Sequence, residues 1–184
     1  MFNADDLPPL REIVGRFNIA AQKSLGQHFL FDLNLTRRVV SVAGDLSGLN
    51  VVEIGAGPGG LTRALLESDA RHVYAVERDP RAVAALRDLE LHAEGRLTVI
   101  DADALQFDLT KEIPHPRRII ANLPYNIGTQ LLINWLMQAD GFLGFTLMFQ
   151  KEVAERIVAS RGTKSYGRLS VISQWLTEPR LMFD

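Results

Sequence analysis

Asn122-Leu123-Pro124-Tyr125 combines a side-chain amide, backbone carbonyls and an aromatic ring in four consecutive residues. The segment follows Ile119-Ile120-Ala121, an apolar run that predicts a buried strand. In open α/β sheets, ligands bind at the carboxyl ends of the strands. An exocyclic amine on a flat ring needs hydrogen-bond acceptors and a π surface, and this tetrapeptide offers both. We therefore expect these four residues to bind a planar substrate that carries an amine.

A glycine-rich turn, residues 53–60 (EIGAGPGG), lies between a predicted strand and a predicted helix. Gly55, Gly57 and Gly60 fit the G-x-G-x-x-G fingerprint of dinucleotide sites, and Glu77 lies 22 residues after Gly55. Taken alone, this pattern indicates an NAD site.

Three further residues of the turn favour a different ligand. Glu53 is an acid inside the strand end, and Pro58 and Gly59 make the turn rigid and wide where a pyrophosphate would be wrapped. An amino-acid ligand suits this turn, because N–H groups at a helix start bind a carboxylate and an acid binds an ammonium group. S-adenosylmethionine is such a ligand, and we expect it as the cofactor.

Acidic residues also end the next two predicted strands. Glu77 can accept hydrogen bonds from a ribose diol, as acids at this place do in nucleoside-binding sheets. Asp101 or Asp103 can accept from an adenine amine, and the small Ala102 and Ala104 leave room for the ring. The alternative for Asp101 and Asp103 is that they form a solvated acidic turn.

Apolar runs of strand type alternate with segments of helical spacing from residue 50 onward. Asp79 is expected to cap a helix that has Pro80 at its first position. The expected strands are 50–54, 72–76, 97–100, 118–121 and 142–149, and the expected helices are 10–17, 34–42, 60–67, 80–92, 129–137, 152–158 and 169–176. This order predicts an α/β fold, a doubly wound and mostly parallel sheet with helices on both faces and the first strand at its centre.

Composition narrows the class of protein. The chain has 184 residues, of which 47% are hydrophobic, and it has no cysteine. One globular domain without disulfides or thiolate metal sites is therefore expected. We expect a cytoplasmic protein that is monomeric and binds neither a metal nor a membrane.

The net charge of -2 is unusual for a nucleic-acid binder, but the charge is unevenly distributed. Residues 11–38 hold five basic and two acidic residues, and residues 151–170 hold the same numbers. The two segments form a basic patch if they share a face, and otherwise they are two solvated helix faces. Lys151 and Arg168 are candidates for phosphate contacts.

Over nearly all residues from Lys23 onward, the chain resembles the class I (Rossmann-like) methyltransferases. More narrowly, it resembles the adenine N6,N6-dimethyltransferases of small-subunit ribosomal RNA. The motifs that carry the resemblance are SLGQHFL at 24–30, EIGAGPGGLT at 53–62, Glu77, Asp103-Ala104, NLPY at 122–125, FQKEV at 149–153 with Arg156, and YGRLS at 166–170.

The resemblance implies roles for the matched residues. Tyr125 and Phe149 would enclose the target base, with Asn122 binding both the base and the cofactor. The implied cofactor-binding residues are Gln27, His28, Leu30, Glu53, Gly55, Gly57, Gly59, Glu77, Arg78, Asp103, Ala104 and Asn122. The implied catalytic residues are Asn122, Leu123, Pro124, Tyr125 and Phe149.

The implied activity is dimethylation of two adjacent adenosines in small-subunit ribosomal RNA, within a 30S-type pre-ribosomal particle. Residues 1–22 would be an N-terminal extension and residues 23–184 the catalytic domain. Because relatives continue into a small helical domain, the resemblance also implies a chain truncated before that domain.

Three other functions remain open. An NAD-dependent oxidoreductase would explain the glycine turn but not the NLPY segment. A non-catalytic RNA-binding relative would keep the fold, but it has no physical need for Glu77, Asp103 and NLPY together. Methylation of DNA or of large-subunit RNA would use the same chemistry.

Overall fold

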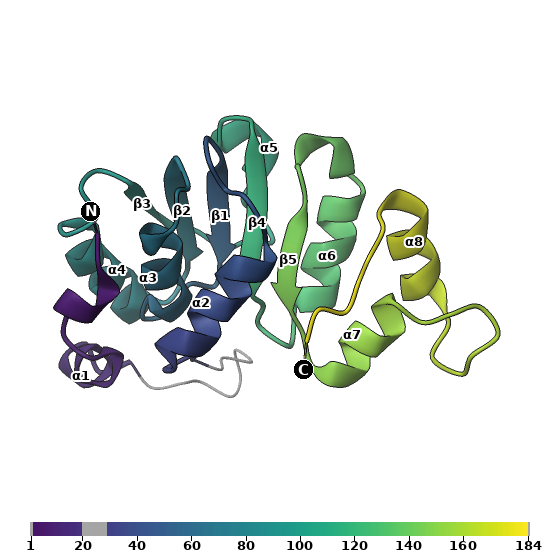
Figure 1. Cartoon of the computed structure of the whole chain (residues 1–184), viewed down its shortest axis with the longest axis horizontal. Helices are drawn as coiled ribbons and strands as arrows, with labels where there is room; N and C mark the ends of the chain where they lie inside the picture. Colours follow the sequence, from purple (N-terminus) through teal and green to yellow (C-terminus); the bar gives the residue numbers. More distant parts are fainter. Residues whose placement is uncertain (1, 20–28, 184) are drawn as a thin grey trace.

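The computed structural model describes residues 2–19 and 29–183. Their central element is a five-stranded parallel sheet of order β3-β2-β1-β4-β5, seen from left to right in Figure 1. The strands are β1 (Asn50–Ile54), β2 (His72–Glu77), β3 (Leu97–Asp101), β4 (Arg117–Asn122) and β5 (Phe145–Met148). The order reverses beside β1, so the predicted doubly wound α/β fold is confirmed.

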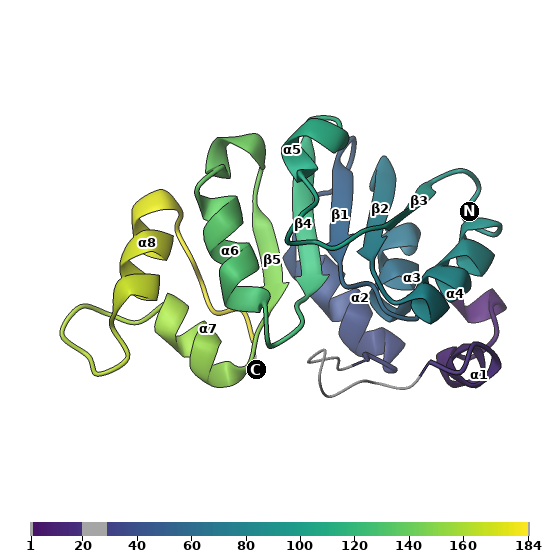
Figure 2. The same cartoon turned by 180° about the vertical axis from the view of Figure 1, so that it is seen from behind.

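Helices cover both faces of the sheet, and the strands supply side chains alternately to each face. One core cluster joins Val51 and Ala75 to α2 (Leu33–Val42), α3 (Gly60–Glu67) and α4 (Pro80–Glu90). The other joins Val52 and Ile54 to α5 (Leu109–Glu112) and α6 (Gly128–Leu136). Accordingly, α2 lies in front of the sheet in Figure 1, and α5 lies in front of it in Figure 2.

Side-chain caps start several helices as the sequence indicates. Asp79 accepts a hydrogen bond from the Arg81 N–H, and Pro80 stands at the first position of α4, as predicted. Asp32 caps α2 through the Asn34 N–H. The short α5 was not predicted, and it is capped by Asp108.

The last strand is shorter than predicted. Residues 142–149 read as one strand, but β5 begins only at Phe145, because a short 3-10 helix, η3 (Ala139–Gly141), and Gly144 with φ of +157° precede it. Beyond β5, α7 (Lys151–Ile157) and α8 (Arg168–Leu176) pack beside α6.

The N-terminal residues pack on the same body as the sheet. They comprise η1 (Ala4–Asp6) and α1 (Leu10–Arg16), and α1 lies at the end of the sheet to which the strand arrows point in Figure 1. Phe2 and Ala4 join the core beside α2 and α3. In the described part of the chain, no helix is both long and apolar enough to span a bilayer.

Candidate cofactor and substrate site

A cavity opens at the carboxyl ends of the strands, beside the point where the strand order reverses. Its walls come from the ends of β1, β2, β3 and β4 and from Phe29. The lining residues are Phe29, Ile54, Gly55, Gly57, Val76, Glu77, Arg78, Ala102, Asp103, Ala104, Asn122, Leu123, Pro124, Asn126 and Ile127. Its position agrees with the general rule for ligands of open α/β sheets.

The glycine turn forms the floor of this cavity. Gly57 has φ of +55°, and a Cβ atom there would lie 3.0 Å from the Phe29 ring. A Cβ on Gly60 would lie 2.3 Å from the carbonyl oxygen of Leu30, which is backbone and cannot turn aside. These two glycines therefore let residues 29 and 30 lie directly against the turn.

Gly59 and Leu30 do not line the cavity, although both were expected to bind the cofactor. Gly59 is the N-cap residue of α3, and a Cβ there would meet Leu86 and Leu89 of α4 at 3.3 and 3.1 Å. Leu30 contributes its carbonyl to the contact with Gly60 instead. Both residues support the turn from outside the cavity.

Glu77 is held in place by three backbone N–H groups. Its Oε2 accepts from Gly57 at 2.9 Å, and its Oε1 accepts from Arg78 at 2.7 Å and from Asp79 at 2.9 Å. A carboxylate offers about four acceptor positions. One position therefore remains for a ribose hydroxyl, and a bidentate bond to a diol requires that one of the three N–H groups moves away.

Asp103 faces the cavity and is fixed at both oxygens. Its Oδ1 accepts from the Leu105 N–H at 3.0 Å, and its Oδ2 accepts from Arg78 at 3.0 Å. Each oxygen keeps a second lone pair that can bind an adenine amine. Arg78 therefore closes the cavity wall between the ends of β2 and β3.

Glu53 lies behind the turn rather than in the cavity. Its side chain is 2% exposed, and its Oε2 accepts from the Thr62 hydroxyl at 2.6 Å. Burial raises the pKa of Glu53 to about 8, against the lowering effect of the Thr62 hydrogen bond, and the charge of Glu77 raises it further. Glu53 therefore joins β1 to α3 through Thr62, and it does not line the cavity in which an ammonium group was expected.

Asn122 and Phe149 lie at neighbouring strand ends. Asn122 pairs with Met148 in the register of β4 and β5, and Phe149 follows Met148 directly. The Phe149 ring is partly buried and lies 3.4 Å from the position of a Cβ on Gly128, at the start of α6. An aromatic ring, Phe149, therefore lies between the end of β5 and the start of α6, and Asn122 lines the cavity at the end of the neighbouring β4.

Tyr125 is 39% exposed and does not point into the hydrophobic interior. Pro124 lines the cavity, but its carbonyl accepts from the N–H groups of Ile127 at 3.2 Å and Gly128 at 2.9 Å. With two donors already on that oxygen, the Pro124 carbonyl has no lone pair left for a substrate amine, and Pro124 serves as wall.

Several cavity residues were not predicted to be part of the site. Phe29, Ile54, Val76, Asn126 and Ile127 line it, and most of them supply apolar wall. Ile54 and Val76 could have been found from the sequence, because they are the side chains at the ends of the two strands that carry the glycine turn and Glu77. Gln27 and His28 lie outside the described residues.

The expected basic patch is only partly present. Arg16 pairs with Asp88, and Arg37 pairs with Glu67 and Asp5, so acids from other segments pair with two of the five basic residues of the first segment. Lys151 and Arg168 are exposed at the first residues of α7 and α8, away from the cavity walls. Within residues 2–19 and 29–183, no cluster of side chains could hold a metal ion.

Comparison with known proteins identifies the family. The family described as "Ribosomal RNA adenine dimethylase" matches residues 18–183. The ribosomal RNA small subunit methyltransferase A of Paracoccus denitrificans is 55% identical over 97% of this chain, and the protein of that name from Jannaschia sp. is 51% identical over 99%. The chain spans 64% of the length of each of these two relatives.

Solved structures agree with the sequence relatives. A dimethyladenosine transferase from Plasmodium falciparum superposes with a TM-score of 0.69 at 31% identity, covering 80% of this chain and 52% of that one. The 23S rRNA methyltransferase ErmE superposes with a TM-score of 0.65 at 30% identity, covering 78% of this chain and 56% of that one. The chain therefore belongs to the ribosomal RNA adenine dimethylase family.

Proposed function

We propose that this chain is the catalytic part of a methyltransferase that dimethylates N6 of two adjacent adenosines in small-subunit ribosomal RNA. S-adenosylmethionine would occupy the cavity, and the RNA would be presented in a small-subunit precursor particle in the cytoplasm. The observation that carries the proposal is the cavity itself, which brings Glu77, Asp103 and Asn122 to one edge of the sheet. The names of the relatives support the choice of substrate.

The residues of the cavity fit an adenosine-containing cofactor. Gly57 keeps the floor open, because any Cβ there would collide with Phe29. Glu77 keeps one acceptor position for the ribose, and Asp103 has acceptor capacity for the adenine amine. Ala102 and Ala104 leave room for the ring in the same wall.

S-adenosylmethionine supplies an electrophilic methyl group on a positively charged sulfur. The nitrogen that receives it is a weak nucleophile, since its lone pair is delocalised into the adenine ring. We assign the Asn122 side chain and the Leu123 carbonyl as acceptors for the N6 hydrogens. Acceptors in these positions favour a pyramidal nitrogen and bind it more strongly as it becomes positively charged.

The target base must leave its stack to reach the site. Stacking on aromatic side chains is worth roughly 1–3 kcal/mol per base, which offsets part of that cost. Tyr125 is 39% exposed and Phe149 lies at the adjacent strand end, and we assign this stacking role to both rings. Lys151 and Arg168 would contact the phosphates, and the enzyme would act as a monomer.

Calorimetric titration with S-adenosylmethionine and, separately, with NAD tests the cofactor. We expect binding of S-adenosylmethionine only. Binding of NAD in its place would identify an oxidoreductase, the alternative that the glycine fingerprint alone favours.

The Tyr125→Ala variant tests the substrate half of the site. Methyl transfer to unmethylated small ribosomal subunits should fall at least tenfold, while affinity for S-adenosylhomocysteine stays within twofold of the wild type. Tyr125→Phe is the matched control, because it keeps the ring and should keep activity. Loss of cofactor affinity in Tyr125→Ala would place the ring in the wrong part of the site, and a wild-type chain that binds the cofactor without methylating RNA would favour a non-catalytic relative.

A further inference from the structure

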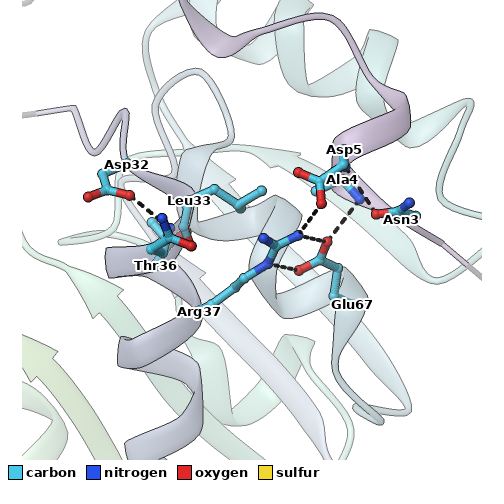
Figure 3. Close-up of polar contacts among 9 residues, drawn as sticks. Asn3, Ala4, Asp5, Asp32, Leu33, Thr36, Arg37 and Glu67 are labelled. Carbon is cyan, nitrogen blue, oxygen red and sulfur yellow. Dashed lines mark hydrogen bonds and ion pairs between the residues drawn. The ribbon is translucent and has the colours of Figure 1, made fainter.

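Residues 2–19 hold no recognised motif before residue 18, where the family match begins, yet they are bound to the folded body at many points. We call them the N-terminal clamp. At one end, Arg37 of α2 donates to both oxygens of Glu67 at 2.7 Å and to Asp5 at 2.9 Å (Figure 3). The Ala4 N–H also donates to Glu67 at 3.0 Å. The hydrogen bonds from Arg37 lower the pKa of Glu67, so this junction stays charged through the neutral pH range.

The middle of the clamp is fixed by a buried cation. Arg63 of α3 is 8% exposed and donates to the carbonyl oxygen of Pro8 at 2.8 Å. Two residues further along the chain, Leu10 packs against the glycine turn, which forms the floor of the cavity. Its Cδ2 atom lies 3.0 Å from the position that a Cβ on Gly60 would occupy. The clamp therefore touches the glycine turn directly.

The far end of the clamp packs against the cavity wall. Ile13 and Ile19 form a buried cluster with Ala82 and Ala85 of α4, and Phe29 packs against that cluster. The Phe29 ring also lines the cavity and lies 3.0 Å from the position of a Cβ on Gly57. Two of the four buried side chains that support Phe29 therefore come from the clamp.

A second chain of contacts connects the N-terminal clamp to Glu77, which lines the cavity. Arg81 donates to the carbonyl oxygen of Asn18 at 3.0 Å and to both carboxylate oxygens of Asp79. The Asp79 N–H in turn donates to Glu77 at 2.9 Å. The clamp is thus linked through α4 to the acid that faces the cavity.

We propose that Ile13 and Ile19 are positioning residues that hold Phe29 over the glycine turn, and that the N-terminal clamp thereby sets the affinity of the cavity for its nucleoside ligand. The identity of that ligand rests on the proposed function, but the positioning does not. A core of this kind is close-packed, so a gap beneath Phe29 lets its ring leave the floor of the cavity.

The test compares Ile13→Ala with Leu132→Ala. Both side chains are 5% exposed, but Leu132 lies in α6, in the cluster that joins α6, α7 and α8. Ile13→Ala should weaken binding of S-adenosylhomocysteine at least fivefold by calorimetry, at a temperature where both variants are folded. Leu132→Ala should stay within twofold of the wild type, and the conservative variant Ile13→Val should restore binding to within twofold.

Amide hydrogen exchange at Gly57 supplies a readout without any ligand. Its N–H donates to Glu77 at 2.9 Å beneath Phe29, so Ile13→Ala should accelerate its exchange at least fivefold and Leu132→Ala should not. Should Ile13→Ala fail to fold, Val14→Ala removes a partly buried member of the same cluster and should give at least a twofold effect in both measurements.

The outcomes separate the two proposals. If the wild-type chain binds no S-adenosylhomocysteine, the proposed cofactor is wrong. Amide exchange at Gly57 then still tests whether the clamp positions Phe29. Wild-type affinity and wild-type exchange in Ile13→Ala overturn the positioning role. Equal effects in Leu132→Ala overturn it too, because they would show a general loss of stability.

Discussion

Replacing Glu53 by glutamine should change how stability depends on pH. Glu53 is enclosed between β1 and α3, where its Oε2 accepts from the Thr62 hydroxyl at 2.6 Å. Burial raises its pKa from the ordinary value of 4.5 to about 8. In the folded protein the carboxyl group is therefore neutral at pH 7, as is the glutamine amide.

The sign and the size of the effect follow from the raised pKa. Between pH 4.5 and about 8, the folded state keeps a proton that the unfolded state has released, so the free energy of unfolding falls as the pH rises. Each pH unit of this window is worth about 1.4 kcal/mol, which gives an upper limit of about 5 kcal/mol. Above pH 8 both states are ionised and the contribution is constant.

Urea unfolding at a series of pH values measures this difference, with the fluorescence of the buried Trp135 as the probe. Wild type and Glu53→Gln should be equally stable near pH 4.5. At pH 8 the free energy of unfolding of the variant should exceed that of the wild type by up to about 5 kcal/mol, and this difference should stay constant at higher pH. Effects of titrating groups that do not interact with Glu53 cancel in the comparison. A difference that does not vary with pH would refute the reasoning, because it would show that Glu53 is ionised in the fold.

Three other variants test the remaining parts of the site. Glu77→Gln turns an NH2 group toward at least one of three backbone N–H groups, so it should weaken S-adenosylhomocysteine binding at least tenfold by calorimetry. Gly60→Ala should cost roughly 1–3 kcal/mol in urea unfolding, because its Cβ would lie 2.3 Å from the Leu30 carbonyl oxygen. Gly15→Ala is its control, since nothing lies within 4 Å there, and it should stabilise the helix by roughly 0.5–1 kcal/mol. Arg168→Gln should lower the slope of log affinity for small-subunit RNA against log salt by about 1, measured by filter binding.

The elements of the sheet could be predicted because two strong signals coincide. Apolar runs of four to six residues mark strands covered on both faces, and a glycine turn or a capping acid marks the start of the next helix. β1 and α3 have the predicted bounds for this reason. The four-residue α5 was not predicted, because so short a helix shows no helical spacing of apolar residues. Its only sequence signal is the capping residue Asp108.

Strand ends were also sufficient to find most of the cavity. Glu77, Asp103 and Asn122 line it because the carboxyl ends of parallel strands meet at one edge. The position of Glu53 outside the cavity lining could also have been read from the sequence. Side chains alternate along a strand, so Glu53 shares the face of Val51, which packs on the helices α2 to α4, and not the face of Ile54, which lines the cavity.

Contacts between distant segments could not be read from the sequence. The charge of residues 11–38 suggested a basic patch, but Arg37 reaches Glu67, which is 30 residues away. Phe29 likewise lines the cavity while it packs against a cluster that joins Ile13 and Ile19 to Ala82 and Ala85 of α4. Such pairings depend on how helices pack on the sheet, which local patterns do not encode.

The reversal of strand order at β1 divides the site into two halves. Acids at the ends of β2 and β3 line the cavity proposed for the cofactor, while Asn122 ends β4 and Phe149 follows β5, where we propose that the target base binds. The halves meet where a Cβ on Gly55 would lie 3.2 Å from the Pro124 ring. Transfer between two bound molecules requires that their reacting atoms be held about 3–3.5 Å apart. Because a methyl group at residue 55 would have to displace the Pro124 ring, we expect the absence of a side chain there to matter for the alignment of the two proposed substrates.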